Sequence, residues 1–411
     1  GNDITVAGEC AILGHNAGSA ITDHGRSVFV GHNAGANQEG EQNVFIGKDA
    51  GLGASGSNND GTVAIGFDSL KALTSGQYNV AVGYQALKAE DDGDYNTAIG
   101  YDALKLQTGV SATVGNTSIG AMSGDAITTG KQNTFVGAFA GSSTQNADSS
   151  IAIGYNAMGN GNVTSDGTVA IGDMTLANVT SGVGNTAVGY SSAMSLVEGN
   201  YNTVLGYNAF DAGQEDSQCV AIGYEALTNA DVSDTGSAVA THNTAVGYAS
   251  GDVVTTGTKN TLLGSATDPS ANSGTNQTVI GFSATGVADN SVTLGDADVT
   301  AVYMAEDSGA TVHTAGIQFP ASQVANGGAN VLDDYEEGDH TATIVGSTSG
   351  NYVVNRTNDI LRYTKIGRLV NIQGLLLIDS DNSASGTLRI SLPFTILDQT
   401  GLGGRSYGSA Y

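Results

Sequence analysis

The stretch 62–100, TVAIGFDSLKALTSGQYNVAVGYQALKAEDDGDYNTAIG, contains one short phrase three times, as TVAIG, NVAVG and NTAIG. Similar phrases continue in both directions, seventeen in all, from CAILG at 10–14 to SVTLG at 291–295, and each ends in glycine. Ten of the sixteen spacings between these glycines are 17 residues. Self-similarity at a fixed period of this length is typical of a solenoid. We therefore expect an all-β fold containing a parallel β-solenoid of about 17 rungs.

The composition limits what the chain can bind. It has 411 residues, 60 glycines, no tryptophan and a formal net charge of -27. The apolar content of 40% is enough for a continuous core, whereas the excess of acid opposes nucleic-acid binding. No run of 18 apolar residues occurs, so we expect no membrane insertion. The chain begins at Gly1 and not at Met, which suggests a fragment or a processed product.

The columns of the repeat phrase predict which side chains face inward. The residue before the glycine is Leu, Val or Ile in every phrase, and the residue two positions earlier is β-branched in every phrase except at Ala11. Period-two alternation places both columns on one strand face, which we expect to face the coil interior. The middle column holds Ala in eight of the seventeen phrases, and larger apolar residues such as Phe29, Phe45 and Phe135 in several others. We expect it to face outward and to be covered by copies of the same chain, which predicts a homo-oligomer.

Other repeat positions carry weaker signals. Tyr84, Tyr101 and their equivalents follow the glycine and should form stacked ladders. The segment after them could be a second strand or a helical turn, and a strand fits the short repeat better. Asn at the phrase start suits a turn position with left-handed backbone and a side-chain ladder between rungs, and the glycine suggests positive φ or close backbone approach.

Irregular features lie outside this pattern. Longer spacings at 51–62, 105–115 and 228–242 predict loops that leave the stack, either as tolerated insertions or as decorations of one side. Cys10 and Cys219 are twelve repeats apart, too far for an intrachain disulfide, and we interpret both as small residues filling a rung position.

The composition changes after the last phrase, which predicts three regions. Residues 1–298 form the solenoid shaft, 299–338 a neck or linker, and 339–411 a small β-sandwich-like tip domain that we expect to be incomplete. Within the tip, 341–346, 351–355, 360–367, 368–379 and 387–394 are typical of strands bounded by Gly, Asn, Asp and Ser.

Two parts of the chain resemble known families. The phrases SIAIGYNAM, NTAVGY and TVAIG resemble the left-handed parallel β-roll heads of trimeric autotransporter adhesins, over about residues 5–297, and similar repeats occur in long bacteriophage tail fibres. The segments TAGIQFP, LDDYEEG, YTKIGRLVNIQG and LRISLPFT look like the distal part of tail-fibre proteins of marine and cyanobacterial phages. The resemblance implies a homotrimer.

Catalytic and metal-binding patterns are weak. In so acidic a chain, two acid clusters are interpreted as solvated turns or features of a trimer neck and not as the paired carboxylates of a glycan hydrolase: Asp91, Asp92 and Asp94, and Asp333, Asp334, Glu336 and Glu337. The absence of tryptophan, which would provide a sugar platform, is a further argument against an enzyme. We assign no catalytic, cofactor or metal residue and leave Ca²⁺ in the acidic loops as a minor alternative. The histidines are scattered, and His15 and His32 occupy the aromatic column, so we expect them to pack in the core. Ice binding is rejected because the Thr column should point inward.

The favoured hypothesis is a non-enzymatic virion protein, a trimeric tail fibre that presents a receptor-binding tip to the host surface. Its partners would be itself, other tail or baseplate proteins, and a host glycan or protein. The alternative is a bacterial trimeric autotransporter-like adhesin or extracellular filament. The candidate receptor contacts lie in three tip loops, around Ser347–Tyr352, Asp379–Ser385 and Gly401–Tyr407. They are Thr348, Ser349, Asn351, Tyr352, Asp381, Asn382, Ser383, Arg405 and Tyr407.

Overall fold

A computed structural model describes residues 9–21, 25–109, 113–161, 163–164, 166–231, 239–302, 335–346, 348–350, 352–354, 360–366, 369–380 and 382–392. The chain divides into two compact units, Gly1–Tyr303 and Met304–Tyr411. The described residues contain strands and turns but no helix. Accordingly, no helix that could cross a membrane is found among them.

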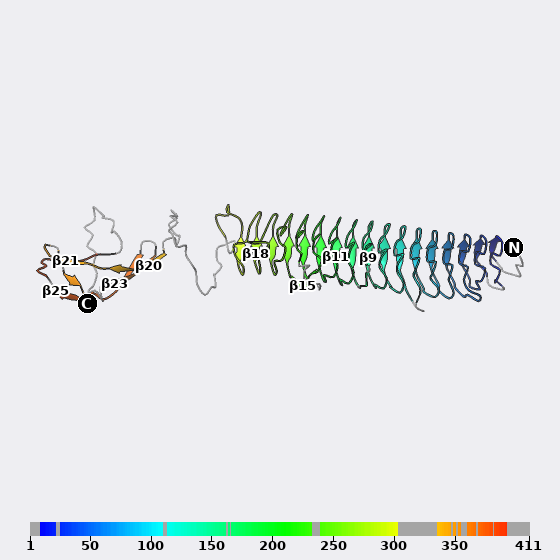
Figure 1. Ribbon diagram of the computed structural model, residues 1–411, viewed down its shortest axis with the longest axis horizontal. Helices are drawn as coiled ribbons and strands as arrows, with labels where there is room; N and C mark the ends of the chain where they lie inside the picture. Colours follow the sequence, from blue (N-terminus) through cyan, green and yellow to red (C-terminus); the bar gives the residue numbers. More distant parts are fainter. Residues whose placement is uncertain are drawn as a thin grey trace. The chain divides into compact units, whose positions relative to one another are not determined.

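The first unit is a parallel β-solenoid with one short strand per coil. Seventeen three-residue strands form one sheet, in which each strand pairs in parallel and in register with the next one along the chain. Figure 1 shows these strands following one another in the same direction. They are β1 (Ala11–Leu13), β2 (Val28–Val30), β3 (Val44–Ile46), β4 (Val63–Ile65), β5 (Val80–Val82), β6 (Thr97–Ile99), β7 (Thr117–Ile119), β8 (Thr134–Val136), β9 (Ile151–Ile153), β10 (Val169–Ile171), β11 (Thr186–Val188), β12 (Thr203–Leu205), β14 (Val220–Ile222), β16 (Thr244–Val246), β17 (Thr261–Leu263), β18 (Thr278–Ile280) and β19 (Val292–Leu294). The predicted solenoid is confirmed.

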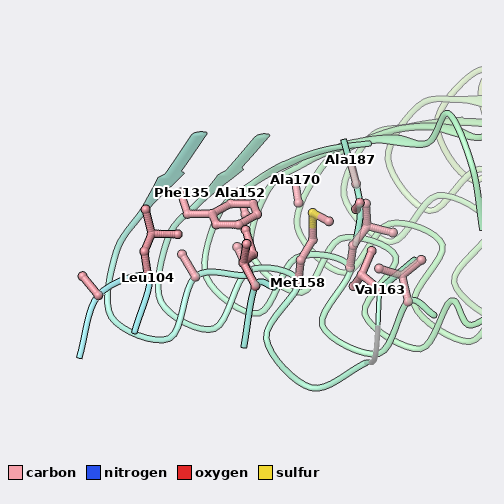
Figure 2. Close-up of a cluster of buried hydrophobic side chains, with 14 of the residues drawn as sticks. Leu104, Phe135, Ala152, Met158, Val163, Ala170 and Ala187 are labelled. Atoms are coloured by element: carbon pink, nitrogen blue, oxygen red, sulfur yellow. The ribbon is translucent and has the colours of Figure 1, made fainter. Parts of the chain in front are cut away.

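The interior of the coil is lined by the middle column, opposite to the prediction from sequence. Phe29, Phe45 and the alanines equivalent to Ala98 are fully buried, whereas the flanking aliphatic columns face outward. Figure 2 shows the buried cluster, with Ala152 and Ala170 above Met158. The sequence prediction was wrong because both strand faces are apolar, and period-two alternation separates the faces without identifying the inner one.

The middle column faces inward because its side chains and those of the facing turn together fill the narrow interior of the coil. Phe in this column is followed six residues later by glycine, as in Phe135 and Gly141. A Cβ on Gly141 would lie 2.7 Å from the Phe135 ring, so no side chain fits there. In six of the eight coils whose column holds Ala, as at Ala98, the residue six positions later is a large buried one such as Leu104; Ala193 and Gly251 are the exceptions. Most coils with Phe or Ala in this column therefore contain one large group and one small group, which keeps the packing density similar from coil to coil.

The segment after each glycine is a hydrogen-bonded turn, neither a strand nor a helix. Gln85 and Leu87 both have positive φ, at 55° and 50°. Their amides donate to the carbonyls of Phe67 in the preceding coil and Ala103 in the following coil, at 2.9 and 3.0 Å. Ladder bonds between coils thus continue beyond the strand, which satisfies backbone groups that the turn would otherwise bury without partners.

The phrase glycine behaves as predicted, whereas the phrase asparagine forms the predicted ladder but does not adopt the left-handed backbone that was expected at its position. Gly83 has φ 144°, and a Cβ there would lie 2.1 Å from the carbonyl oxygen of Gly100 in the next coil. Asn79 is buried; its Nδ2 donates to the Gly93 carbonyl at 2.8 Å, and its Oδ1 accepts from the Asn96 amide at 2.8 Å. The left-handed residue of this turn is the one before Asn, such as Tyr78 with φ 58°.

The long spacings add short bridges beside the stack. β13 (Asp216–Ser217) pairs in parallel with β15 (Val239–Ala240), at the end of the predicted 228–242 insertion. Single bridges join Gln38 to Ser57 and Asp94 to Thr113. Residues 110–112 and 232–238, within two of the predicted loops, lie outside the described residues.

The second unit consists of small antiparallel sheets. β20 (Tyr335–Thr341), β23 (Ile360–Ile366) and β24 (Leu369–Gln373) form one sheet. β21 (Ile344–Gly346) pairs with β26 (Leu388–Ile390), and β22 (Val353–Val354) pairs with β25 (Ile378–Ser380). Strands thus occur in all five segments predicted from the sequence. β20 begins at Tyr335, within the expected neck, and most of that neck lies outside the described residues.

Candidate functional site

The outward face of the long sheet is apolar and exposed. Leu205 and Leu263 are 48% and 46% exposed, although both belong to the column expected in the core. Other large aliphatic side chains exposed in this column are Leu13, Ile99, Ile119, Ile153, Ile280 and Leu294. Because soluble monomers rarely expose a contiguous apolar patch of more than a few hundred Å², a face of this kind marks an interaction surface. We call it the sheet face.

The β-branched column lies on the same sheet face. Thr186, Thr203 and Thr261 are exposed, and most of the other residues in the column are half-buried. The reason for rejecting ice binding, that these threonines point inward, is therefore wrong. The sheet face consists of an aliphatic column beside a column of mainly Thr and Val. Ice is therefore one candidate ligand of this face, and an experiment must distinguish it from a second copy of the chain.

The aromatic column runs beside the sheet face and is stacked as predicted. Tyr190, Tyr207, Tyr224 and Tyr248 form a run of four rings with centroids 5.0, 5.5 and 5.1 Å apart and interplanar angles of 13° or less. A second run joins Phe67, Tyr84 and Tyr101. These rings are exposed, so the column is a surface feature and not part of the core.

The histidines of this column follow the same rule. His15 and His32 stack with centroids 5.2 Å apart, but both are exposed, so their predicted place in the core is wrong.

Of the two cysteines, Cys219 is fully buried as a small residue of the rung, and burial raises the pKa of its thiol to about 11. Cys10 is half-buried, and neither cysteine forms a disulfide.

Many acidic side chains support the coil itself. The carboxylates of Asp94, Asp148 and Asp289 accept hydrogen bonds from backbone amides one rung earlier, those of Gln77, Lys131 and Thr275, each at 2.7 Å. Hydrogen bonds from Thr275 and then Gln277 hold the pKa of Asp289 below its usual range. The acidity of the chain therefore has a structural role, because these aspartates satisfy backbone donors that the turn leaves unpaired.

One acidic cluster has the geometry of a cation site. Glu90, Asp91 and Asp92 each place a carboxylate oxygen within 4.8 Å of the others. Glu90 is buried and accepts bonds from the Asp91 and Gly93 amides at 3.0 and 2.8 Å and from the Gln107 side chain. Burial raises the pKa of Glu90. Protein donors thus already occupy its oxygens, and Ca²⁺ in the acidic loops stays the minor alternative that it was from the sequence.

Lysines beside the aromatic column form ion pairs along one part of the solenoid. Lys71 Nζ lies 3.0 Å from Asp68 and 3.8 Å from Asp49 in the preceding coil. Lys105 Nζ lies 2.8 Å from Asp102. Next to this pair, burial and then the charge of Asp102 raise the pKa of Asp125 to about 6.

Two of the three predicted receptor loops lie side by side in the second unit. The Thr348 amide donates to the Ser385 carbonyl at 3.0 Å, and the Ser349 and Ser385 hydroxyls are 2.8 Å apart. The Tyr352 amide donates to the Ile344 carbonyl. Asn382 and Ser383, in the facing loop, have positive φ values of 34° and 60°. The structure therefore joins the loops around 348–352 and 382–385 into one edge of the unit.

The remaining candidate contacts, Asn351, Asp381, Arg405 and Tyr407, lie outside the described residues. The same holds for Asp333 and Asp334 of the second acid cluster, whereas Glu336 and Glu337 lie on β20 opposite Lys365 and Thr364. That cluster therefore falls partly on a strand and is not a single turn.

The exposure of the sheet face was not predicted from the sequence. The six-residue relation between the middle column and the turn, Phe with Gly and Ala with Leu, could have identified the inner column. Comparison with known proteins adds no assignment, because no family model matches the chain and no curated protein matches it either.

Proposed function

We propose that this chain is a structural, non-enzymatic fibre protein of a virion tail. In this proposal three copies associate through the sheet face, and the C-terminal unit contacts the host surface. Seventeen rungs span roughly 80 Å at about 4.8 Å per rung, which suits a spacer. Three identical tips per fibre would convert weak contacts with a host glycan or protein into avidity.

The observation that carries the proposal is the exposed sheet face. Its aliphatic column continues through seventeen in-register strands, so two copies of the same face can match rung against rung. Obligate homo-oligomer interfaces are more apolar than ordinary surface. The neighbouring turns are polar and carry the Asp ladder described above, which makes them a less favourable interface.

Light scattering of the whole chain tests the association. The expected mass is three times the 41.1 kDa of one chain. Leu205→Lys and Leu263→Lys place charges on the sheet face and should lower the mass to that of a monomer. Gln145→Lys, on an exposed turn, is the matched control and should leave the trimer intact. A folded monomer for the unchanged chain contradicts the proposal, and ice-growth inhibition by that monomer would assign the sheet face to ice.

The location of the protein, on virions or on bacterial cells, distinguishes the tail-fibre hypothesis from the adhesin hypothesis. Antibodies raised against the chain, viewed by immunogold electron microscopy, should label the tails of virions. Labelling of bacterial cell surfaces without virions would support the autotransporter-like adhesin or an extracellular filament instead.

Receptor contact is tested at the paired loops of the C-terminal unit. Tyr352→Ala and Asn382→Ala should reduce adsorption of the protein to host cells without changing its mass in solution. Lys365→Ala, on β23, is the control in the same unit and should adsorb normally. Unchanged adsorption of both loop variants would exclude this edge as the contact surface.

A further inference from the structure

Gaps in the aromatic column present ring faces that no neighbouring ring covers. All six pairs of aromatic residues in successive coils of this column are stacked, from His15 with His32 to Tyr224 with Tyr248. The column is interrupted at Asp173, which lies between Tyr155 in the preceding coil and Tyr190 in the following one. The uniform stacking indicates that rings at these positions lie across the solenoid axis, facing the neighbouring coils.

The gap at Asp173 has a defined width. Adjacent strands lie about 4.8 Å apart, so the rings of Tyr155 and Tyr190, two coils apart, are separated by roughly 10 Å. A group placed midway lies about 5 Å from each ring centroid, within the ~6 Å over which a cation is attracted to an aromatic face. Tyr155 and Tyr190 are 52% and 44% exposed, so the gap is open to solvent.

The charge in this gap is negative and lacks a protein counter-ion. Asp173 is exposed and makes no ion pair with any residue that the structure describes. Residues 132–302 contain one lysine, Lys259, and no arginine. Phe139, from the coil before Tyr155, packs against the Tyr155 ring edge to face at 5.8 Å and an angle of 81°, which supports the ring on that side.

One ring of this column, that of Phe67, already has a cation over its face. The stacked run that begins at Phe67 is preceded in the column by Lys48. Lys48 Nζ lies over the Phe67 ring, 5.3 Å from its centroid. An internal ammonium thus occupies the open end of one aromatic run, whereas the gap at Asp173 offers two ring faces and a carboxylate without an internal cation.

We propose that Tyr155, Asp173 and Tyr190 form a binding site for an organic ammonium group, such as a quaternary ammonium or a protonated amine. The two rings would contact the cation through their faces, and the Asp173 carboxylate would balance its charge. This site lies in the solenoid unit and does not depend on the fibre proposal or on the loops of the C-terminal unit.

A second gap in the same column provides an internal control. Ser265 lies between Tyr248 and Phe282, again with one aromatic residue on each side, but it carries no charge. The two gaps therefore share the aromatic arrangement and differ at the central residue. If the rings alone sufficed, both gaps would bind; if the carboxylate is required, only the gap at Asp173 binds.

Titration of the full chain with choline, followed by calorimetry and by saturation-transfer NMR, tests the site. We expect one choline per chain and at least tenfold weaker binding of 3,3-dimethylbutan-1-ol, the neutral analogue with the same shape. Asp173→Asn and Tyr155→Ala should each weaken choline binding at least tenfold. Tyr248→Ala should not change it, and Ser265→Asp should add a second equivalent.

Several results would overturn the proposal. No choline binding by the unchanged chain excludes the site, as does equal affinity for the neutral analogue. Equal affinity for methyl glucoside would assign the gap to neutral sugars instead. Asp173→Asn alters an exposed side chain and should fold, so unchanged choline binding by this variant refutes the role of the carboxylate even if Tyr155→Ala does not fold.

Discussion

The buried asparagine ladder should contribute strongly to the stability of each rung. Asn185 is buried; its Nδ2 donates to the Gly199 carbonyl at 2.7 Å, and its Oδ1 accepts from the Asn202 amide at 2.9 Å. Asn185→Ala leaves the Gly199 carbonyl and the Asn202 amide without these hydrogen-bond partners. An unsatisfied buried polar group costs about 1–3 kcal/mol, so the two groups together should lower the free energy of unfolding by about 2–6 kcal/mol.

Asn146→Ala is the matched control, because the Asn146 side chain accepts hydrogen bonds from the Thr128 and Thr129 hydroxyls at 2.9 Å on the exposed surface, and its backbone is not left-handed. Its cost should stay within about 0.5 kcal/mol. Denaturant unfolding measures both variants, and hydrogen exchange at the Asn202 amide reports the local effect, since solenoid coils interact mainly with their neighbours. If the two variants differ by less than about 1 kcal/mol, the buried hydrogen bonds of Asn185 do not stabilise the coil.

Three further predictions concern the glycine, the core and the acids. Gly83→Val should lower the free energy of unfolding by more than about 3 kcal/mol, because its Cβ would meet the Gly100 carbonyl; an intact melting curve contradicts this. Phe135→Ala should cost about 3–5 kcal/mol in chemical unfolding, and Phe282→Ala, at an exposed ring, should cost about 0.5 kcal/mol. The folded pKa of Asp125, about 6, exceeds the unfolded value of about 3.9, so the folded state loses stability as pH rises from 4 to 6. Asp125→Asn should therefore be more stable by about 1 kcal/mol above pH 6, after discounting for solvent screening, and the gain should vanish below pH 4.

The fold was largely predictable from the repeat. A phrase that returns every 17 residues with glycine at its end can be satisfied by coils stacked in register, and the strands at Val80–Val82 and Thr97–Ile99 lie where the phrases predict them. The strict glycine follows from one backbone passing close to the next, as at Gly83 and Gly100. The C-terminal strands were equally visible, because polar and glycine-rich turns separate short apolar segments.

The candidate surfaces were less predictable. Stacked tyrosines followed directly from in-register repetition, but their exposure did not. The gap at Asp173 is visible in the sequence as one acidic residue in an aromatic column. Its meaning depends on the neighbouring rings, whose spacing is known only once the coils are stacked.

The sequence by itself determined the period, the parallel register, the glycine and asparagine ladders and the change of unit after the last phrase. Only the tertiary structure decided which strand face is inside. Ala98 is buried and Ile99 is exposed, although Ile is the more hydrophobic of the two. The physical reason is space: Leu104 fills the narrow coil opposite Ala98, and the larger aliphatic side chains of the strand must face outward, where they form the sheet face.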